Sequence, residues 1–457
     1  MSNILTRHLD RRGFLRLGAQ ATASASMMAT LGSLQTAMAA SDTSGYKALV
    51  CVFLAGGNDS YNWLVPRSDA AYNDYAASRR NLALPKADLL PITPTNTGSA
   101  LYGLHPSCPE IRTLFQSGKA AFVVNNGPLV QPTTIAQYQA ESVPLPYQLY
   151  SHSDQQALTQ TCIANSLERY GWAGRTADLL NSQGFRQPLA MNVSINGNNV
   201  FQGGRETVFY SLGVNGAPEM NIYREDGYRQ GKRRELFLEL LRQSGNDPSL
   251  LQQEFGNTLT RSYQTAETVN AALASVSALT TSFGTDTASK QLKMAAQMVR
   301  ARDALGVKRQ VFFVQVGGWD FHDNMLSDQA TKLGELSKAL KSFQDAMTEI
   351  GTENLVTTFV ASEFGRTLTS NGDGTDHAWG GHTLVLGGAV QGQKFYGTYP
   401  SLILKGPDDV GRGAMLPTTS TDQVAATLAQ WFGVSNGDLD TVFPNLRNFS
   451  QRNLGFV

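Results

Sequence analysis

Runs of apolar and β-branched residues are spaced along the chain, and several end in glycine-rich polar segments. Continuous apolar runs are typical of strands buried on both faces of a parallel sheet. The runs predicted as strands are 46–54, 120–127, 309–316, 354–361 and 383–388. Helices are predicted between them at 105–118, 327–351 and 421–433, of which 327–351 is the most clearly amphipathic. This pattern predicts an α/β fold with a mainly parallel central sheet.

The middle of the chain has a different pattern. Short β-like pieces lie within 189–215, and 230–304 is mostly helical, with charged and apolar residues at amphipathic spacing. The glycine-containing segment 171–175 is predicted to separate one helix from the next, at 176–180. We therefore predict a single α/β domain over 40–457 with a mostly helical elaboration at about 190–305.

The first 39 residues are typical of a targeting signal. Arg11 and Arg12 form a twin-arginine pattern, a weakly apolar region follows, and 37–39 offers a cleavage site of small residues. A membrane anchor is the alternative, but glutamines and serines interrupt the apolar region well short of a spanning length. We expect a Tat-type signal peptide over 1–39. The protein would then pass through the Tat translocase and be periplasmic or secreted.

Composition excludes some classes of function. Residues 1–39 hold four arginines and one aspartate of the 37 basic and 37 acidic residues, so the rest of the chain is close to neutral and slightly acidic. Nucleic-acid binders normally have a basic surplus, and no later stretch is apolar enough to span a membrane. The three cysteines form no metal-binding spacing. Cys51 is expected in the core, and Cys108 and Cys162 either pair or stay free.

Candidate ligands for a metal ion follow the predicted strands. Asp320 and His322 come directly after the strand 309–316 and two glycines, and Asp59 comes after the first strand. Carboxylate and imidazole groups in such loops can bind one divalent ion. The alternatives are that Asp320 caps the next helix, that His322 is incidental, and that Asp59 belongs to an Asx turn.

Further candidates lie at a helix start and after a third strand. Ser151, His152 and Ser153 stand at a predicted helix N-terminus, where a hydroxyl could be activated or could simply cap the helix. His152 could orient or protonate a substrate, or be structural. Arg366 follows the strand 354–361 together with Glu363, and it could bind an oxyanion or form an ion pair.

The histidines are not scattered. After residue 39 the chain has five, and four of them lie in predicted loops or at helix starts beside Asp, Glu or Ser. The five histidines are His105, His152, His322, His377 and His382. Clustering of histidine and carboxylates in loops after strands is the pattern of a catalytic or metal site.

In this order, the motifs GGND, SH, GWxGR, GGWDxH, SEFGRT and GTDH–W resemble those of the bacterial family called domain of unknown function 1501, over essentially the whole chain after residue 39. That family is similar in turn to the alkaline phosphatase–sulfatase superfamily. The similarity implies a three-layer αβα sandwich. It also implies a nucleophile near Ser151 or Ser153 and metal ligands at Asp59, Asp320, His322, Glu363, and His377 or His382.

Two departures from the superfamily pattern stand out. Phe364 occupies the place of a metal-binding histidine, and the usual nucleophile signature is not visible around Ser151. An altered ligand set that includes Asp376 and His382 is the alternative to a complete two-metal site.

The resemblance implies an exported metal-dependent hydrolase of phosphate or sulfate esters that uses one or two Zn²⁺, Mn²⁺ or Ca²⁺ ions. The alternative is a non-catalytic envelope or surface-assembly protein on the same fold. A redox protein is disfavoured because the sequence has no GxGxxG after a strand, no CxxCH and no cysteine cluster.

Overall fold

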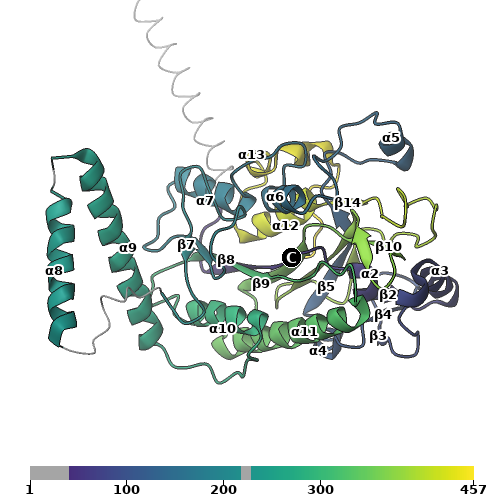
Figure 1. Cartoon of the computed structure of the whole chain (residues 1–457), viewed down its shortest axis with the longest axis horizontal. Coiled ribbons are helices and arrows are strands. Elements are labelled where there is room, and N and C mark those ends of the chain that lie inside the picture. The colour runs from purple at the N-terminus through teal and green to yellow at the C-terminus, as the bar shows by residue number, and fades with distance from the viewer. Residues whose placement is uncertain (1–40, 218–227, 247) are drawn as a thin grey trace, which may run out of the picture.

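The computed structural model describes residues 41–217, 228–246 and 248–457 (Figure 1). The predicted signal peptide over 1–39 therefore lies outside the described residues. Within them, a nine-stranded sheet has the order β13-β5-β12-β9-β1-β8-β6-β7, with β14 paired to β5. The bounds are β1 Lys47–Leu54, β5 Ala120–Gly127, β6 Asn192–Ser194, β7 Tyr210–Ser211, β8 Arg309–Val316, β9 Val356–Ser362, β12 Gly381–Leu386, β13 Phe395–Tyr396 and β14 Thr419–Ser420.

The centre of the sheet is parallel. β1 pairs in parallel with β8 on one side and with β9 on the other. β12 is antiparallel to both β9 and β5, so the sheet is mixed but mostly parallel. The predicted α/β class is confirmed.

Helices cover both faces of the sheet, which explains why its central strands are continuously apolar (Figure 1). Alternate residues of β1 belong to two separate core clusters, Val50 and Val52 to one and Leu49 and Cys51 to the other. The first cluster includes residues of α4 (Pro109–Gln116), α10 (Thr287–Arg300) and α11 (Met325–Ile350). The second includes residues of α7 (Trp172–Ser182), α12 (Thr421–Phe432) and α13 (Leu439–Val442). The arrangement is the expected three-layer sandwich.

The two core clusters also show whether Cys108 and Cys162 can form a disulfide. Cys108 belongs to the cluster on one face of the sheet and Cys162 to the cluster on the other. Both are buried free thiols, as is Cys51. Because the sheet lies between them, Cys108 and Cys162 do not pair in this fold.

Shorter elements surround the sheet. At one end lie α2 (Ser60–Trp63), α3 (Asp69–Arg79), the three-stranded sheet β2 (Leu64–Pro66), β4 (Tyr102–Leu104) and β3 (Leu90–Ile92), and the hairpin β10 (Arg366–Ser370) with β11 (Thr375–His377). α5 (Ile135–Gln139) and α6 (His152–Thr161) precede α7, and short 3₁₀ turns cover 80–82 and 444–448. α8 (Tyr228–Ser244) and α9 (Leu250–Ser275) form a helical hairpin that stands beside the sandwich in Figure 1.

Two predicted boundaries need correction. The helix predicted at 105–118 begins at Pro109, which occupies the first helical position because its missing N–H is not needed there. The segment 171–175 does not separate two helices, because Gly171 is the N-cap of α7 and the helix runs on through Gly174. Gly174 is required because a Cβ there would overlap the backbone of Gly203.

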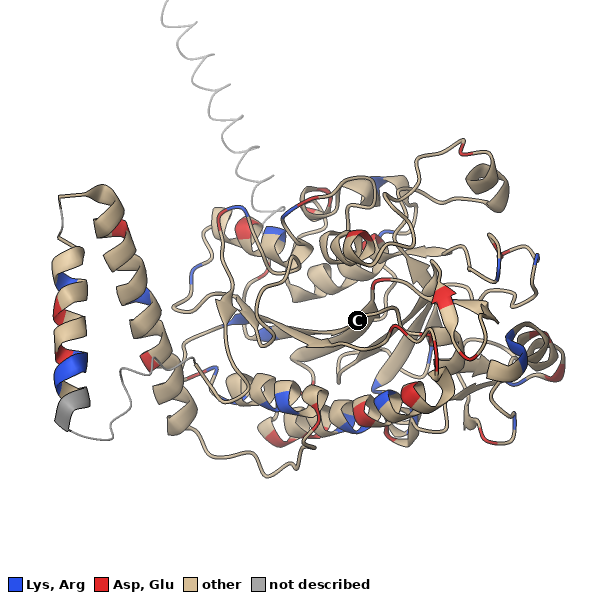
Figure 2. Cartoon of the chain, viewed as in Figure 1, with Lys and Arg blue, Asp and Glu red and all other residues tan. Residues whose placement is uncertain are grey.

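Residues of both charges occur on the same elements of the fold (Figure 2). Figure 2 shows basic and acidic residues interspersed over the sandwich helices and the α8–α9 hairpin. Among the residues that the structure describes, no helix is long and apolar enough to cross a bilayer.

Candidate metal centre

The candidate site lies where neighbouring central strands end. Asp320 and His322 follow β8, and Glu363 follows β9. Because β8 and β9 both run parallel to β1, their loops emerge at the same edge of the sheet. His377 ends β11, and His152 is the first residue of α6. Five side chains from four elements are thus brought together.

Three imidazole rings converge on the carboxylate of Asp320. Nε2 of His322 lies 3.0 Å from Oδ1 of Asp320, and Nε2 of His377 lies 3.2 Å from the same oxygen. The two Nε2 atoms are 3.1 Å apart. Nε2 of His152 lies 3.4 Å from the other carboxylate oxygen, Oδ2. Ligand atoms of His152, Asp320 and His377 all lie within 4.8 Å of one another.

The opposite nitrogen of each ring faces an oxygen atom. Nδ1 of His152 lies 3.0 Å from Oε1 of Glu363, and Nδ1 of His377 lies 2.8 Å from the carbonyl oxygen of Tyr150. Nδ1 of His322 lies 3.5 Å from Oδ1 of Asp376. The oxygens facing His152 and His377 accept hydrogen bonds, so they assign the proton of each of these two neutral rings to Nδ1. The Nε2 lone pairs of His152 and His377 then point toward Asp320.

This donor set fits a metal ion. Two imidazole nitrogens and a carboxylate oxygen this close together require a proton or a metal ion between them. The three atoms form a triangle with edges of 3.0, 3.1 and 3.2 Å. Ligands around a tetrahedral zinc ion, at 2.0–2.1 Å from it, lie about 3.3 Å apart. Oxygen partners behind ligating histidines are also the usual arrangement in metal sites.

Glu363 lies behind His152 rather than in the centre. Its side chain is fully buried and accepts hydrogen bonds from Gly56 N at 2.8 Å and Gln156 Nε2 at 2.9 Å, besides the contact with His152. Burial opposes ionisation of this carboxyl, but the hydrogen bonds from His152 and Gln156 outweigh it, and its pKa is lowered. The hydrogen bond to Glu363 in turn raises the pKa of His152 against the opposing effect of burial.

Arg366 is a buried partner of Asp320. Its guanidinium is fully buried and donates to the carbonyl oxygens of Gly57, Gly56 and Thr375, and to Oδ1 of Asp320. Burial alone would raise the pKa of Asp320, but the hydrogen bond and the charge of Arg366 lower it. The sequence left an oxyanion clamp or an ion pair open for Arg366, and the structure places it in the ion pair.

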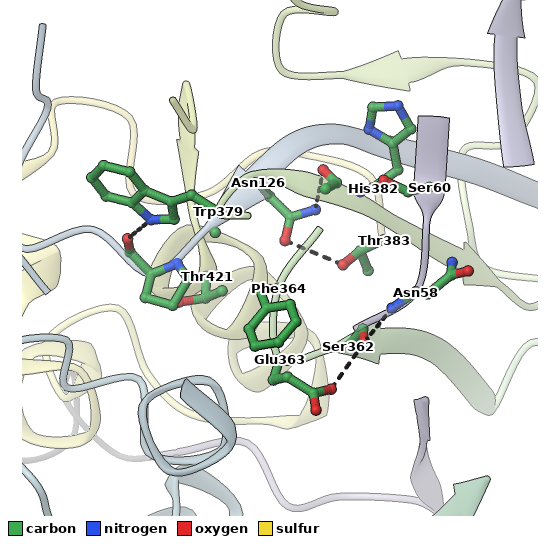
Figure 3. Close-up of a pocket in the computed structure, with 13 residues that line it drawn as sticks. Asn58, Ser60, Asn126, Ser362, Glu363, Phe364, Trp379, His382, Thr383 and Thr421 are labelled. Carbon is green, nitrogen blue, oxygen red and sulfur yellow. Dashed lines mark hydrogen bonds between the residues drawn. The ribbon is translucent and has the colours of Figure 1, made fainter. Parts of the chain in front are cut away.

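Phe364 forms the inner wall of the centre. Its ring centroid lies 4.9 Å from that of His152 and 4.8 Å from that of His377. Burial lowers the pKa of His377 at this wall. Phe364 and Glu363 also line a cavity of about 20 Å³, and Figure 3 shows the residues around it. That volume suits an ordered water and is too small for a substrate. Substrate access is therefore expected from the outer side, where Asp320 and His322 are each about two-fifths exposed.

Two residues predicted as metal ligands lie elsewhere. Asp59 is fully buried and pairs with Arg79, with 2.6 Å between Oδ2 and NH2. His382 is buried beside Tyr61, and its Nδ1 accepts a hydrogen bond from Asn125 N at 3.0 Å. Burial lowers the pKa of His382 to about 3. Asp59 is the N-cap of α2 and His382 lies in β12, and both side chains point into packed interior and not toward Asp320.

Other predicted residues are near the centre without entering it. Ser151 is the N-cap of α6, but its Oγ donates to Oδ2 of Asp154 at 2.5 Å, and Ser153 is exposed. Neither hydroxyl is hydrogen-bonded to the described histidines. Asp376 lies behind His322 and pairs with Arg412 at 3.0 Å.

Sequence reasoning missed three participants. They are the carbonyl oxygen of Tyr150, the amide of Gln156 and the guanidinium of Arg412. A carbonyl has no sequence signal. Tyr150 stands in a left-handed conformation, with φ of 74°, that turns the chain into α6. A single glutamine or arginine can be recognised as part of a site only when its neighbours in space are known.

Comparison with known proteins identifies a family. A profile described as "Protein of unknown function (DUF1501)" matches residues 46–439. Among curated proteins, no sequence matches significantly.

Solved structures with a similar fold are enzymes of the alkaline phosphatase–sulfatase superfamily. They include the lipoteichoic acid synthase LtaP from Listeria monocytogenes, with 9% identity over 86% of this chain and 73% of that chain and a TM-score of 0.36. Lipooligosaccharide phosphoethanolamine transferase A from Neisseria meningitidis has 8% identity over 85% and 88%, with a TM-score of 0.34. A Bacteroides thetaiotaomicron sulfatase has 11% identity over 87% and 74%, with a TM-score of 0.31. Likenesses this low carry no weight for activity.

Proposed function

The chain belongs to the DUF1501 family, and we propose that it is an exported metal-dependent hydrolase of phosphate or sulfate esters. One observation carries the proposal. The Nε2 atoms of His152, His322 and His377 converge on Asp320 while each Nδ1 faces an oxygen acceptor. Export through the Tat translocase to the periplasm or beyond is part of the proposal and rests on residues 1–39.

We assign the ion to three protein ligands. His322, His377 and Asp320 would hold it, because their ligand atoms form the triangle with edges close to a tetrahedral coordination shell. Two imidazoles and one carboxylate favour Zn²⁺ or Mn²⁺ over Ca²⁺, which prefers six to eight oxygen ligands. Three protein ligands leave a position open for substrate, as in catalytic sites.

The bound ion would supply Lewis acidity toward the ester oxygens. The chain's own residues have separate tasks. His152 faces the centre through Nε2 and is fixed through Nδ1 by Glu363, an arrangement suited to carrying a proton to the leaving group. Arg366, which is fully buried, donates a hydrogen bond to Asp320 and lowers its pKa, so it keeps this carboxylate ionised. No side-chain hydroxyl is assigned as nucleophile, because among the described residues none is hydrogen-bonded to Asp320 or to the three histidines, and Ser151 contacts Ser153 and Asp154 instead.

Metal content and turnover test this assignment in one set of variants. Protein purified without chelator would be analysed by inductively coupled plasma mass spectrometry and assayed with p-nitrophenyl phosphate, bis-p-nitrophenyl phosphate and p-nitrophenyl sulfate. We expect near-stoichiometric metal in wild type, loss of metal in His322→Ala and His377→Ala, and retained metal with about 100-fold lower turnover in His152→Gln. His382→Gln is the control that should keep its metal. A folded wild type that takes up neither Zn²⁺ nor Mn²⁺ would refute the proposal.

A non-catalytic envelope or surface-assembly protein is the second candidate. The observation that favours it is that, within the part of the chain that the structure describes, no side-chain hydroxyl is hydrogen-bonded to the centre and Arg366 is buried. Metal that is bound stoichiometrically without hydrolysis of any of the three esters would favour this candidate. The ion would then be structural.

A further inference from the structure

Arg412 is an exposed cation at the rim of the centre. Its side chain is 69% exposed, and NH1 lies 3.0 Å from Oδ2 of Asp376. Oδ1 of the same carboxylate faces Nδ1 of His322 at 3.5 Å. The guanidinium is therefore one carboxylate away from a proposed metal ligand.

The two arginines of the site have opposite surroundings. Arg366 is fully buried and donates to three carbonyl oxygens and Asp320, so it cannot reach an anion at the surface. Within the described residues, the guanidinium of Arg412 has one hydrogen-bond partner, Asp376. Most of its five N–H donors are thus open to a ligand.

The loop holds Arg412 in an unfavourable backbone conformation. Its φ is 59°, a left-handed value that residues other than glycine seldom adopt. Asp409 fixes the loop by accepting hydrogen bonds from three backbone N–H groups within 405–413 at 2.7–2.8 Å. The carbonyl oxygen of Arg412 accepts from Oγ1 of Thr369 at 2.8 Å. Strained residues that the surrounding structure over-determines concentrate at functional sites.

We infer that Arg412 binds the tetrahedral oxyanion of the substrate, a phosphate or sulfate group, beside the metal centre. The inference rests on the proposed function. The ion pair with Asp376 occupies only NH1 of Arg412, so the rest of its guanidinium can face an anion at the exposed side of the centre. A guanidinium can bind two oxygens of a tetrahedral anion at once, and its planar fork fits them better than an ammonium group does.

Anion binding to metal-loaded protein tests the inference. Inorganic phosphate and, in a separate arm, sulfate would be titrated by calorimetry into wild type, Arg412→Ala and Arg412→Lys, each with its Zn²⁺ content measured. We expect Arg412→Ala to weaken binding of at least one anion by about 10- to 100-fold at unchanged metal content. Arg412→Lys should fall between the two, and the arm that responds identifies the group.

A matched variant separates anion binding from support of the metal ligand. Asp376→Asn removes the carboxylate behind His322 and leaves Arg412 in place, so we expect weaker metal binding without weaker anion binding at saturating Zn²⁺. Equal anion affinity in wild type and folded Arg412→Ala, or no anion binding by metal-loaded wild type, would overturn the inference while the metal centre stands. Loss of metal in Arg412→Ala would overturn it too, since Arg412 would then act through Asp376. A wild type without metal would overturn the proposed function and this inference with it.

Discussion

At the scale of single residues, the environment of Asp320 explains how a carboxylate stays ionised beside three histidines. Arg366 contacts it from the buried side, and the hydrogen bond and charge of this guanidinium outweigh the effect of burial on the pKa of Asp320. Nε2 of His322 and of His377 lie near the same oxygen, Oδ1, and Nε2 of His152 lies near Oδ2. An ionised carboxylate whose buried flank is already neutralised can offer its outer flank to a cation.

The variant Asp59→Ala tests whether Asp59 is a structural carboxylate or a metal ligand. Its pairing with Arg79 is fully buried at 2.6 Å, so Asp59→Ala would leave an uncompensated guanidinium in the interior. Removing one partner of such a pair costs about 3–5 kcal/mol of unfolding free energy. We expect that loss in urea denaturation, with metal content unchanged in the folded fraction.

The control for Asp59 is a surface pair of the same type. Asp69 pairs with Lys86, but the Asp69 side chain is 94% exposed. Asp69→Ala should hardly change stability, because exposed pairs contribute little. Loss of metal in folded Asp59→Ala would contradict the structural assignment and restore Asp59 to the ligand set.

Asp422 predicts a pH dependence of stability. Burial raises the pKa of this carboxyl, at the start of α12, to about 7 against the opposing hydrogen bond from Ser420 and the charge of Arg175. Between the ordinary value of 3.8 and about 7, the unfolded chain has released this proton and the folded chain retains it. Stability therefore falls as pH rises through this window, by a few kcal/mol at most, on the order of 1.4 per pKa unit.

The comparison for Asp422 is Asp422→Asn, which has no proton to lose. Urea unfolding from pH 4 to pH 8 should show a smaller decline in the variant, so that the variant is the more stable protein at pH 8 and not at pH 4. Parallel pH profiles for the two proteins would show that the carboxyl does not titrate in this window. The difference between the profiles removes the contribution of other groups, including the histidines.

At the scale of elements, the docking of α7 predicts an unusual effect of a glycine substitution. Alanine normally stabilises a helix interior relative to glycine by about 1 kcal/mol. A Cβ on Gly174 would overlap the backbone of Gly203, so Gly174→Ala must displace α7 or the adjoining segment and destabilise the protein. Gly231→Ala in α8 is the control, since nothing lies within 4 Å of its Cβ, and it should stabilise. Thermal unfolding of both variants checks the opposite signs.

Elements differed in how well their sequences predicted them. β5 and β8 have the predicted bounds, 120–127 and 309–316. Burial on both faces makes the middle of each strand continuously apolar, and this run is visible in the sequence. β13 and β14 have two residues each and were not predicted, since so short a segment has no periodicity. The place of β12, antiparallel between β5 and β9, depends on contacts distant in sequence.

At the scale of the whole molecule, the topology of the sheet explains which residues of the site could be predicted from the sequence. Placing candidate ligands at strand ends predicts that Asp320 and His322 meet residues from other loops, and His377 joins them. Residue type alone could not separate His377 from His382, only five positions later, because the first faces the centre and the second faces Tyr61. His377 ends β11 and His382 lies in β12, and these strands belong to different sheets whose pairings depend on residues distant in sequence.

Because the proposed ligands come from distant parts of the chain, metal binding should stabilise the whole fold. Asp320 and His322 follow β8, and His377 ends β11, so an ion bound to all three favours the folded state alone. Zn²⁺ at about 1,000 times its dissociation constant would add about 4 kcal/mol to the unfolding free energy. For a chain of this size that corresponds to a rise of a few degrees in the unfolding temperature. Differential scanning fluorimetry after chelation and after readdition of Zn²⁺ measures it. The double variant His322→Ala/His377→Ala should show no such rise, whereas His382→Gln should keep it. An equal response of wild type and the double variant would place the stabilising ion elsewhere.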